Sequence, residues 1–200
     1  MRKSAAEAAE TRKRIIEVAS RAFKSKGIEA TGVAEVMAAA GLTHGGFYRH
    51  FESKEQLVAE ACAASMEVLV EAAEQAAGSE STFFKHLKDF LSAEYRDDCV
   101  GGCPLVAMGS ELVRADRATR RGASQGFSKI IDIMARHSRE QGTAAARADA
   151  MFTLSAMIGA VTMSRIVDDP QLSDQILEAA RKRLISKAGK SPKKRPRSKA

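Results

Sequence analysis

The chain has 200 residues, enough for one domain of fair size or two small ones. Its 32 lysines and arginines outnumber 25 aspartates and glutamates, a formal net charge of +7. The charge is unevenly placed: residues 1–50 carry +4, residues 51–186 carry −4 and residues 187–200 carry +7. This excludes a uniformly basic protein that coats nucleic acid and leaves room for a local basic surface.

The composition also makes a membrane protein and a disulfide-stabilised protein poor interpretations of this chain. No apolar run approaches the roughly 18 residues needed to cross a bilayer. The N-terminal Met-Arg-Lys-Ser is not followed by the apolar stretch of a signal peptide. Three cysteines are few and odd in number, which does not suit a disulfide framework. We therefore expect a soluble cytoplasmic protein without membrane contact.

Hydrophobic periodicity predicts an all-α fold of about nine helices, and no stretch shows the period of two that is typical of a strand. The predicted helices cover 6–26, 33–40, 44–50, 53–77, a segment bearing Phe83 to Tyr95, a segment that begins at Pro104, 116–140, 144–167 and 172–186. Residues 187–200 are rich in Lys, Arg, Ser and Pro and are expected to be a disordered tail.

The first three predicted helices have the dimensions of a helix-turn-helix unit. Helix 6–26 carries one apolar stripe from Ile15 to Phe23, which would brace the next two helices. Gly27 follows it, as expected of a left-handed residue past a helix end, and Gly41 stands in the turn between the second and third helices. The short segment 44–50 begins His-Gly-Gly, so its backbone could approach a major groove closely.

One continuous string carries a family resemblance: Gly41-Leu42-Thr43-His44-Gly45-Gly46-Phe47-Tyr48-Arg49-His50-Phe51-Glu52-Ser53-Lys54-Glu55-Gln56-Leu57, preceded by Gly27-Ile28-Glu29-Ala30-Thr31. It resembles the DNA-binding domain of the TetR family of bacterial transcriptional repressors, over about residues 10–60. Residues 158–161 and 168–173 loosely resemble the family's dimerisation helices. The resemblance implies an N-terminal helix-turn-helix domain over 1–54, extending into the fourth helix to about 68. A C-terminal helical domain over 55–186 would bind ligand and dimerise.

The resemblance also implies DNA contacts. Four residues would lie nearest the bases: Thr43, His44, Gly45 and Gly46. Phosphate contacts would come from Tyr48, His50 and Lys54, with Arg49 reaching base or backbone. Thr31 would cap the second helix or touch phosphate, and Gly32 stands where family members often have Ser or Thr, which leaves only its backbone N–H for that contact. Without the family resemblance, the plainer interpretation is that His44 and Lys54 are ordinary exposed side chains and that Tyr48 is a partly packed ring.

Large apolar side chains of the body are candidates for a pocket that takes an unknown small-molecule inducer. They are Phe83, Phe84, Leu87, Phe90, Leu91, Tyr95, Leu105, Met108, Phe127, Ile131, Met134, Phe152 and Met157. The plainer interpretation is that these residues form the core.

Helix 144–167 is apolar almost all round and needs cover on several sides. Packing it and the last helix against a second copy would make a four-helix interface, and a homodimer suits a palindromic operator. The candidate interface residues are Phe152, Ala156, Gly159, Ala160, Met163, Leu172, Ile176 and Leu177.

Cys99 and Cys103 flank Val100-Gly101-Gly102, so a disulfide between them is sterically feasible. Cys103 would stand at a helix N-terminus, where the dipole lowers a thiol pKa, and the pair is a candidate redox or electrophile sensor. The plainer interpretation is an idle thiol in a loop. The four histidines show no metal-ligand spacing, and neither metal nor cofactor is predicted.

We expect a homodimeric repressor, not an enzyme, that a small molecule releases from a palindromic operator in double-stranded DNA. Two alternatives stay open at this point. One is an all-helical thiol-dependent enzyme using Cys99 and Cys103. The other is a nonspecific nucleic-acid binder that acts through residues 187–200.

Overall fold

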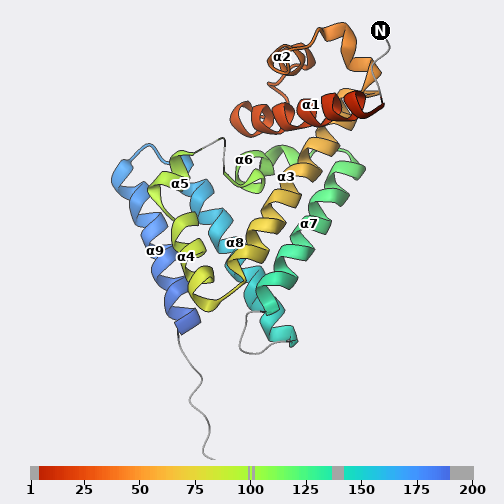
Figure 1. The fold of residues 1–200 in the computed structure, drawn as a ribbon. Coiled ribbons are helices and arrows are strands. Elements are labelled where there is room, and N and C mark those ends of the chain that lie inside the picture. The colour runs from red at the N-terminus through yellow and green to blue at the C-terminus, as the bar shows by residue number, and fades with distance from the viewer. Residues whose placement is uncertain (1–4, 99, 101, 137–141, 190–200) are drawn as a thin grey trace, which may run out of the picture.

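The structure is a computed structural model that describes residues 5–98, 100, 102–136 and 142–189; these form helices joined by turns and loops and contain no β-strand. The all-α fold predicted from the sequence is confirmed. In chain order the elements are α1 (Ala5–Lys26), α2 (Val33–Ala39), the 3-10 helix η1 (His44–Arg49), α3 (Lys54–Ala76), α4 (Glu80–Phe90), α5 (Ala93–Asp97), α6 (Pro104–Leu112), α7 (Arg117–Arg136), α8 (Ala144–Ile166) and α9 (Pro170–Gly189) (Figure 1).

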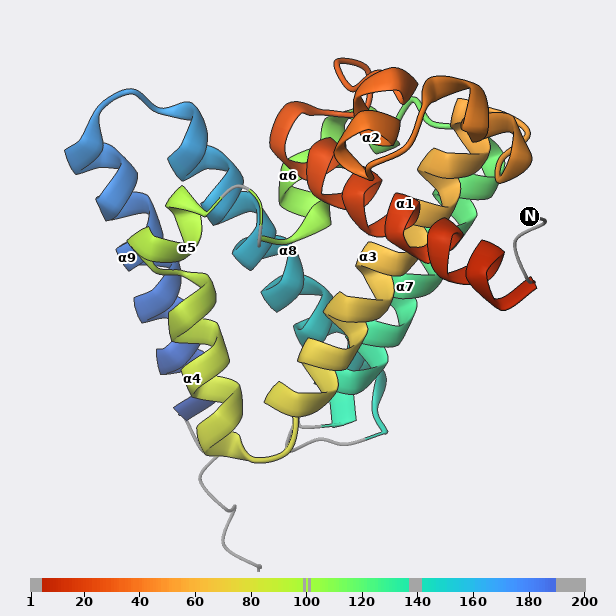
Figure 2. The same ribbon diagram turned by 45° about the horizontal axis from the view of Figure 1, so that its top comes forward.

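α1, α2 and η1 form a small head at one end of the molecule, and the remaining helices form the body (Figure 1). Figure 2 shows α1 crossing the first part of α3, which runs from the head into the body. In the body α3 packs along α7, α7 along α8, and α8 along α9, while α4 contacts both α3 and α9. α6 lies beneath the head and packs against α1 and α8. The head therefore rests on the body through α3 and α6.

α3 and α7 approach each other closely at Gly126. A Cβ atom built at Gly126 would lie 3.1 Å from the Cβ of Met66, and the Met66 side chain is almost fully buried. A side chain at this position would have to push the two helices apart, because the clash reaches an atom next to the partner backbone. Glycine at this position therefore permits the close packing of α3 on α7.

α4 and α5 are two helices where the periodicity predicts one. Leu91 leaves the helical conformation, and the Ser92 Oγ accepts a 3.1 Å hydrogen bond from the Tyr95 N–H. A serine that satisfies a free N–H in this way starts a new helix. The segment expected to run to Tyr95 is therefore interrupted, and the described residues contain ten helical elements rather than about nine.

The last helix is longer than predicted at both ends. It begins at Pro170, because the Asp169 Oδ1 accepts hydrogen bonds from the N–H groups of Gln171 (2.9 Å) and Leu172 (3.3 Å), and proline suits the first helical position. It continues to Gly189, three residues past the boundary at which the tail was predicted to begin. The predicted disorder of residues 190–200, and helix at 137–140, lie outside the described residues.

α8 is, among the described helices, long and apolar enough to cross a membrane by length and composition. By that criterion the expectation that no segment approaches this length is wrong. α8 packs against α6, α7 and α9, however, and a single helix of this kind is equally typical of the core of a soluble protein.

Candidate nucleic-acid interface and internal cavity

An apolar core fixes η1 within the head. Phe47 of η1 is 1% exposed and stacks on Phe51 with ring centroids 5.5 Å apart, and Met37 of α2 is fully buried beside them. Between α2 and η1 the chain turns at Gly41, which has φ 72° and donates its N–H to the Ala38 carbonyl at 2.9 Å. Packing thus holds the element that carries the predicted base contacts, as a precise contact surface requires.

The outward side of η1 is polar apart from one ring. Tyr48 is 71% exposed and touches Phe47 edge to face, with ring centroids 5.3 Å apart. Gly46 is half-buried against Met37 of α2. The other predicted contact residues are exposed or, for His50, half-buried: Thr43, His44, Gly45, Arg49 and His50. The structure thus brings this set together on one short element and the residues directly before and after it.

Arg12 of α1 joins the end of η1 to α3. Its guanidinium makes a bidentate ion pair with Glu60, with one of the two contacts at 2.8 Å, and its Nε donates to the His50 carbonyl at 3.2 Å. It also lies 4.4 Å from the centroid of the Phe51 ring. The bound guanidinium lowers the pKa of the Glu60 carboxyl. Sequence reasoning missed Arg12, because its partners lie about forty residues or more away along the chain.

Lys54 is the first residue of α3 and lies at a helix N-terminus, as the sequence predicts. Ser53 caps this helix by accepting a 3.2 Å hydrogen bond from the Gln56 N–H, and the Gln56 side chain accepts from the Glu52 N–H at 2.7 Å. The second bond reaches one residue before the position that a capping box predicts. Lys54 is half-buried and borders a cleft of about 220 Å³ between head and body, which Glu111 also lines.

Thr31 does not have its predicted role. Thr31 is fully buried, and its hydroxyl donates to the Gly27 carbonyl at 2.7 Å, so its side chain neither caps α2 nor reaches a phosphate. The N-cap of α2 is Gly32, which is exposed. Thr43 occupies the N-cap of η1, but its side chain makes no capping hydrogen bond.

Glu111 of α6 connects the body to the head. Its carboxylate accepts a 3.0 Å hydrogen bond from the Ile28 N–H and a 2.8 Å hydrogen bond from the Glu29 N–H. Gly27, with φ 91°, ends α1 and turns these two N–H groups toward the body. A backbone turn with adjacent free N–H groups is a ready acceptor of a carboxylate. The backbone of the turn after α1 therefore attaches the head to α6.

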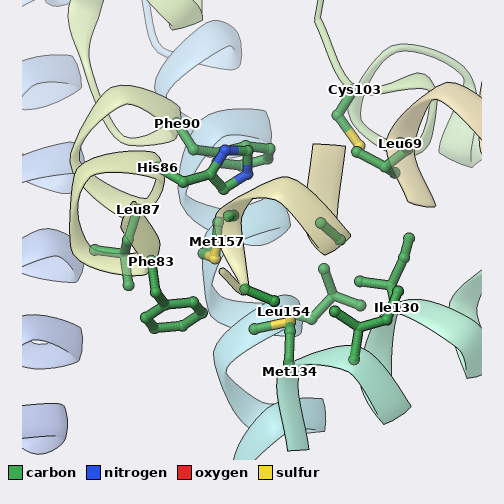
Figure 3. A pocket seen from close by; sticks show the side chains of 14 residues that line it. Leu69, Phe83, His86, Leu87, Phe90, Cys103, Ile130, Met134, Leu154 and Met157 are labelled. Atoms are coloured by element: carbon green, nitrogen blue, oxygen red, sulfur yellow. The ribbon is translucent and has the colours of Figure 1, made fainter. Parts of the chain in front are cut away.

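A small cavity of about 40 Å³ lies inside the body between α3, α4, α7, α8 and the start of α6 (Figure 3). Its lining is apolar except for one imidazole. The lining residues are Leu69, Ala73, Ala76, Ala77, Phe83, His86, Leu87, Phe90, Cys103, Ile130, Ile133, Met134, Leu154 and Met157. Burial lowers the pKa of His86, which favours the neutral ring.

Only part of the predicted pocket set lines this cavity: Phe83, Leu87, Phe90, Met134 and Met157. The others lie elsewhere, in the core or half-buried around it: Phe84, Leu91, Tyr95, Leu105, Met108, Phe127 and Ile131. Phe152 is 56% exposed and cannot line it. The predicted set contained only large apolar side chains. It therefore missed His86, which is polar, and the alanines of α3, which are small.

Cys103 lines the cavity, and its surroundings do not favour the predicted reactivity. It stands at the N-cap of α6, as expected, yet it is 2% exposed, and burial raises the pKa of its thiol. The desolvation outweighs the backbone N–H groups of the helix start, which act in the opposite direction. Cys99 lies outside the described residues, and so do the predicted pair and its disulfide. The structure does not support Cys103 as an exposed sensor.

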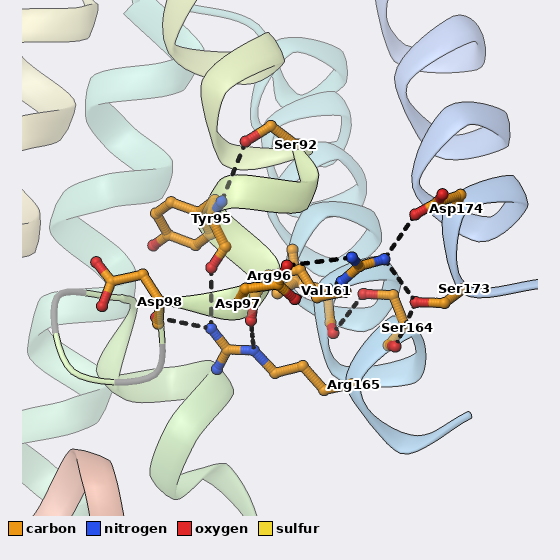
Figure 4. Close-up of polar contacts among 10 residues, drawn as sticks. All are labelled: Ser92, Tyr95, Arg96, Asp97, Asp98, Val161, Ser164, Arg165, Ser173 and Asp174. Carbon is orange, nitrogen blue, oxygen red and sulfur yellow. Dashed lines mark hydrogen bonds and ion pairs between the residues drawn. The ribbon is translucent and has the colours of Figure 1, made fainter. Parts of the chain in front are cut away.

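Polar contacts join α5 to α8 and α9 (Figure 4). Arg165 of α8 donates to the backbone carbonyls of Arg96 (2.8 Å) and Asp98 (3.0 Å), so it satisfies acceptors that the end of α5 leaves open. Arg96 pairs with Asp174 of α9 at 2.7 Å. α8 and α9 are thereby fixed relative to the segment that leads to Cys103 and α6.

α8 and α9 expose apolar side chains. Phe152, Met163 and Leu172 of the predicted interface set are exposed, as are Met151 and Ile166. Spacings of seven and eleven residues place Gly159 and Met163 on the face of Phe152.

Other residues of the predicted interface set are less exposed. Ala156, Gly159 and Ile176 are half-buried. Ala160 and Leu177 are only 6% and 4% exposed and pack inside the chain, so they offer little surface to a second copy.

Family models match both parts of the chain. The model described as bacterial regulatory proteins, tetR family, matches residues 15–61. The model described as the transcriptional regulator LmrA/YxaF-like C-terminal domain matches residues 78–181, more than half of the chain. The HTH-type transcriptional regulator AcrR of Shigella flexneri is 44% identical over 59 residues, which are 30% of this chain and 27% of that protein. The match thus spans about a quarter of this curated relative.

Solved structures share the fold over nearly the whole chain. A TetR transcriptional regulator from Chloroflexus aurantiacus is 27% identical, with a TM-score of 0.68 over 90% of this chain and 95% of that one. The SmeT–triclosan complex is 18% identical, with a TM-score of 0.62 over 94% of this chain and 99% of that one. At that identity the likeness of SmeT concerns the fold alone.

Proposed function

Because the chain belongs to the TetR family and is a DNA-binding transcriptional regulator, we propose that it acts as a homodimeric repressor. A small molecule would bind the body and release the protein from a palindromic operator. The observation that carries the proposal is the position of α6, which begins at the wall of the cavity and ends at the head.

The operator would be read by η1. Thr43, His44, Gly45 and Gly46 would approach base edges in the major groove, since small residues let the backbone come close. Tyr48, His50 and Lys54 would contact phosphates, and Arg49 would reach a base or the backbone. Most of these residues are exposed and the others are half-buried, and they lie on or beside η1 and at the start of α3, which supports these assignments. Thr31 is excluded from the set because its side chain is buried.

The dimer would form through α8 and α9. The exposed face of α8 carries Phe152 and Met163, and Leu172 extends the apolar surface onto α9. Large apolar side chains gathered on adjacent helices favour an interaction surface. A two-fold axis through this surface would present two heads to two half-sites, which a palindromic operator requires.

Release would follow from a shift of α6. Cys103 caps α6 at the cavity wall, and Glu111 holds the head from its other end, about 12 Å away at 1.5 Å per residue. A ligand that widens the cavity would displace the start of α6 and, through Glu111, the turn after α1. The two heads would then be wrongly spaced for successive major grooves, so the population would move off the operator.

The small-molecule partner has a parallel in SmeT, which was solved as a triclosan complex. A thiol-dependent enzyme is less consistent with the buried Cys103 thiol, whose pKa is raised. Binding through the basic tail is tested by removing residues 187–200: a specific repressor keeps its operator preference, whereas a tail-driven binder loses most of its affinity. A DNA-binding regulator of this family would work in the cytoplasm.

The experiment for the proposed function begins with fragments of the source genome that the purified full chain retains. A retained palindrome, occupied by two chains, supports the dimeric repressor. Retention of all fragments alike contradicts it. The genes beside the retained palindrome then provide candidate inducers, and loss of operator binding on their addition tests release.

A further inference from the structure

The cavity lining carries information about the chemistry of the ligand, and this inference rests on the proposed function. We propose that the cavity binds an uncharged apolar molecule that carries a single hydroxyl group, with His86 as the hydrogen-bond partner of that hydroxyl. The bulk of the molecule would contact the aromatic, aliphatic and methionine side chains of the wall.

Charged ligands do not fit this lining. Among the described residues, no Asp, Glu, Lys or Arg borders the cavity. A carboxylate or an ammonium group would therefore lose its water and find no opposite charge, which costs far more than an apolar contact recovers. The lining selects neutral molecules.

His86 supplies a donor and an acceptor at one point of the apolar wall. Figure 3 shows its ring beside Phe90 on α4, and the two ring centroids are 6.3 Å apart. In the described part of the chain no hydrogen bond engages this imidazole. A neutral imidazole has one N–H and one bare nitrogen, and a hydroxyl can pair with either. A ligand without a polar group would displace water from His86 and leave the ring without a partner.

The size of the cavity limits the ligand and links its binding to α6. A volume of about 40 Å³ has room for water, whereas an apolar cavity that holds benzene measures about 150 Å³. A ring-sized ligand must therefore move the wall. Met134 and Met157 are the adaptable side chains of the lining, because an unbranched thioether chain repacks easily. Cys103 lies on the same wall, so the expansion would reach the first residues of α6.

The test uses three probes of one shape on the full chain: 4-propylphenol, propylbenzene and 4-propylbenzoate. Isothermal titration calorimetry gives their dissociation constants for the wild type, H86F, H86Q and K88A. The phenylalanine keeps a ring and removes both hydrogen-bonding nitrogens; the glutamine keeps a donor and an acceptor. Lys88 is exposed on the same helix and serves as the matched control.

We expect the wild type to bind the phenol and not the benzoate. The ratio of phenol to propylbenzene affinity should fall about tenfold in H86F, as expected for one lost hydrogen bond. That ratio should largely survive in H86Q and be unchanged in K88A. Comparing this ratio between variants cancels the cost of removing each probe from water, because that cost is the same for every variant.

The proposal is overturned if the ratio is unchanged in H86F, if the benzoate binds as well as the phenol, or if no probe binds the wild type. Circular dichroism and melting temperature establish that H86F is folded, and H86Q supplies the comparison if it is not. Operator binding distinguishes a failure of the proposed ligand class from a failure of the proposed repressor function. A chain that binds an operator but shows no His86-dependent ratio overturns the ligand class alone. A chain that shows the ratio but binds no operator overturns the proposed repressor and not the ligand class.

Discussion

The side-chain carboxylate of Glu111 in the body accepts a 2.8 Å hydrogen bond from the backbone N–H of Glu29 in the head. The same carboxylate accepts a second hydrogen bond of 3.0 Å from the neighbouring Ile28 N–H, so the contact is bidentate. Because the donors belong to the backbone, side-chain changes at Ile28 or Glu29 should leave the bonds in place, whereas substitutions at Glu111 remove them. α6 thus offers a single side chain at which communication between body and head can be interrupted.

E111A should uncouple ligand binding from release. Without the carboxylate, the turn after α1 no longer follows α6, so a saturating ligand should lower operator affinity much less than in the wild type. Ligand affinity itself should change little, because Glu111 is remote from the cavity lining. Fluorescence anisotropy of labelled operator with and without ligand measures this. S110A, an exposed neighbour on α6, is the control; full release in E111A would contradict the role of the contact.

R12K should weaken specific DNA binding more than it weakens the fold. Lysine keeps the positive charge but loses the bidentate pair with Glu60 and the planar contact with Phe51. The end of η1 would be less well fixed, so we expect operator affinity to fall about tenfold, the change that corresponds to about 1.4 kcal/mol, while affinity for random DNA stays the same. R14K on the exposed side of α1 controls for the exchange of arginine for lysine. Equal losses on both DNAs would count against a positioning role for Arg12.

K54A and H44A should differ in what they change. Removing a phosphate contact at Lys54 should weaken binding to all sequences and reduce the slope of log K against log salt by about 1. Removing a base contact at His44 should alter sequence preference and leave that slope unchanged. Titrations on operator and random DNA at several salt concentrations make the comparison. The assignment fails for both residues if the two variants lose affinity in the same pattern.

G126A should destabilise the body by about 1–3 kcal/mol, because the added methyl group meets Met66 across the contact of α3 and α7. Urea unfolding measures the change. G122A lies one turn earlier on α7 and has open space around it, so it should instead stabilise the helix by about 0.5–1 kcal/mol. If both variants had the same effect, helix propensity rather than close packing would explain Gly126.

Local signals made the head predictable. Gly27 and Gly41 have the positive φ that their places past a helix end and in a turn suggest, and the Ser53 cap begins α3 where expected. These features depend on a few adjacent residues, so one stretch of sequence contains them. The 3-10 geometry of η1 and the burial of Thr31 were not predicted, because no local motif signals either of them.

The body was predictable only as a set of helices. An apolar residue such as Leu91 faces the core whereas Phe90 borders the cavity, and the difference lies in how neighbouring helices pack. α8 is apolar on several faces, so its pattern could not separate the exposed Met163 from the buried Ala160. Arg12 and Glu111 act on partners far along the chain, and neither carries a motif of its own.

In the proposed function a ligand in the body releases a dimer from a palindromic operator. Its most direct test is the mass of the complex between the full chain and an operator retained from the source genome, measured before and after the inducer is added. We predict two chains on each palindrome, and free dimers and free DNA once the inducer is present. A single chain on the site, or a complex whose mass and affinity do not change with any compound that binds the cavity, would contradict the account.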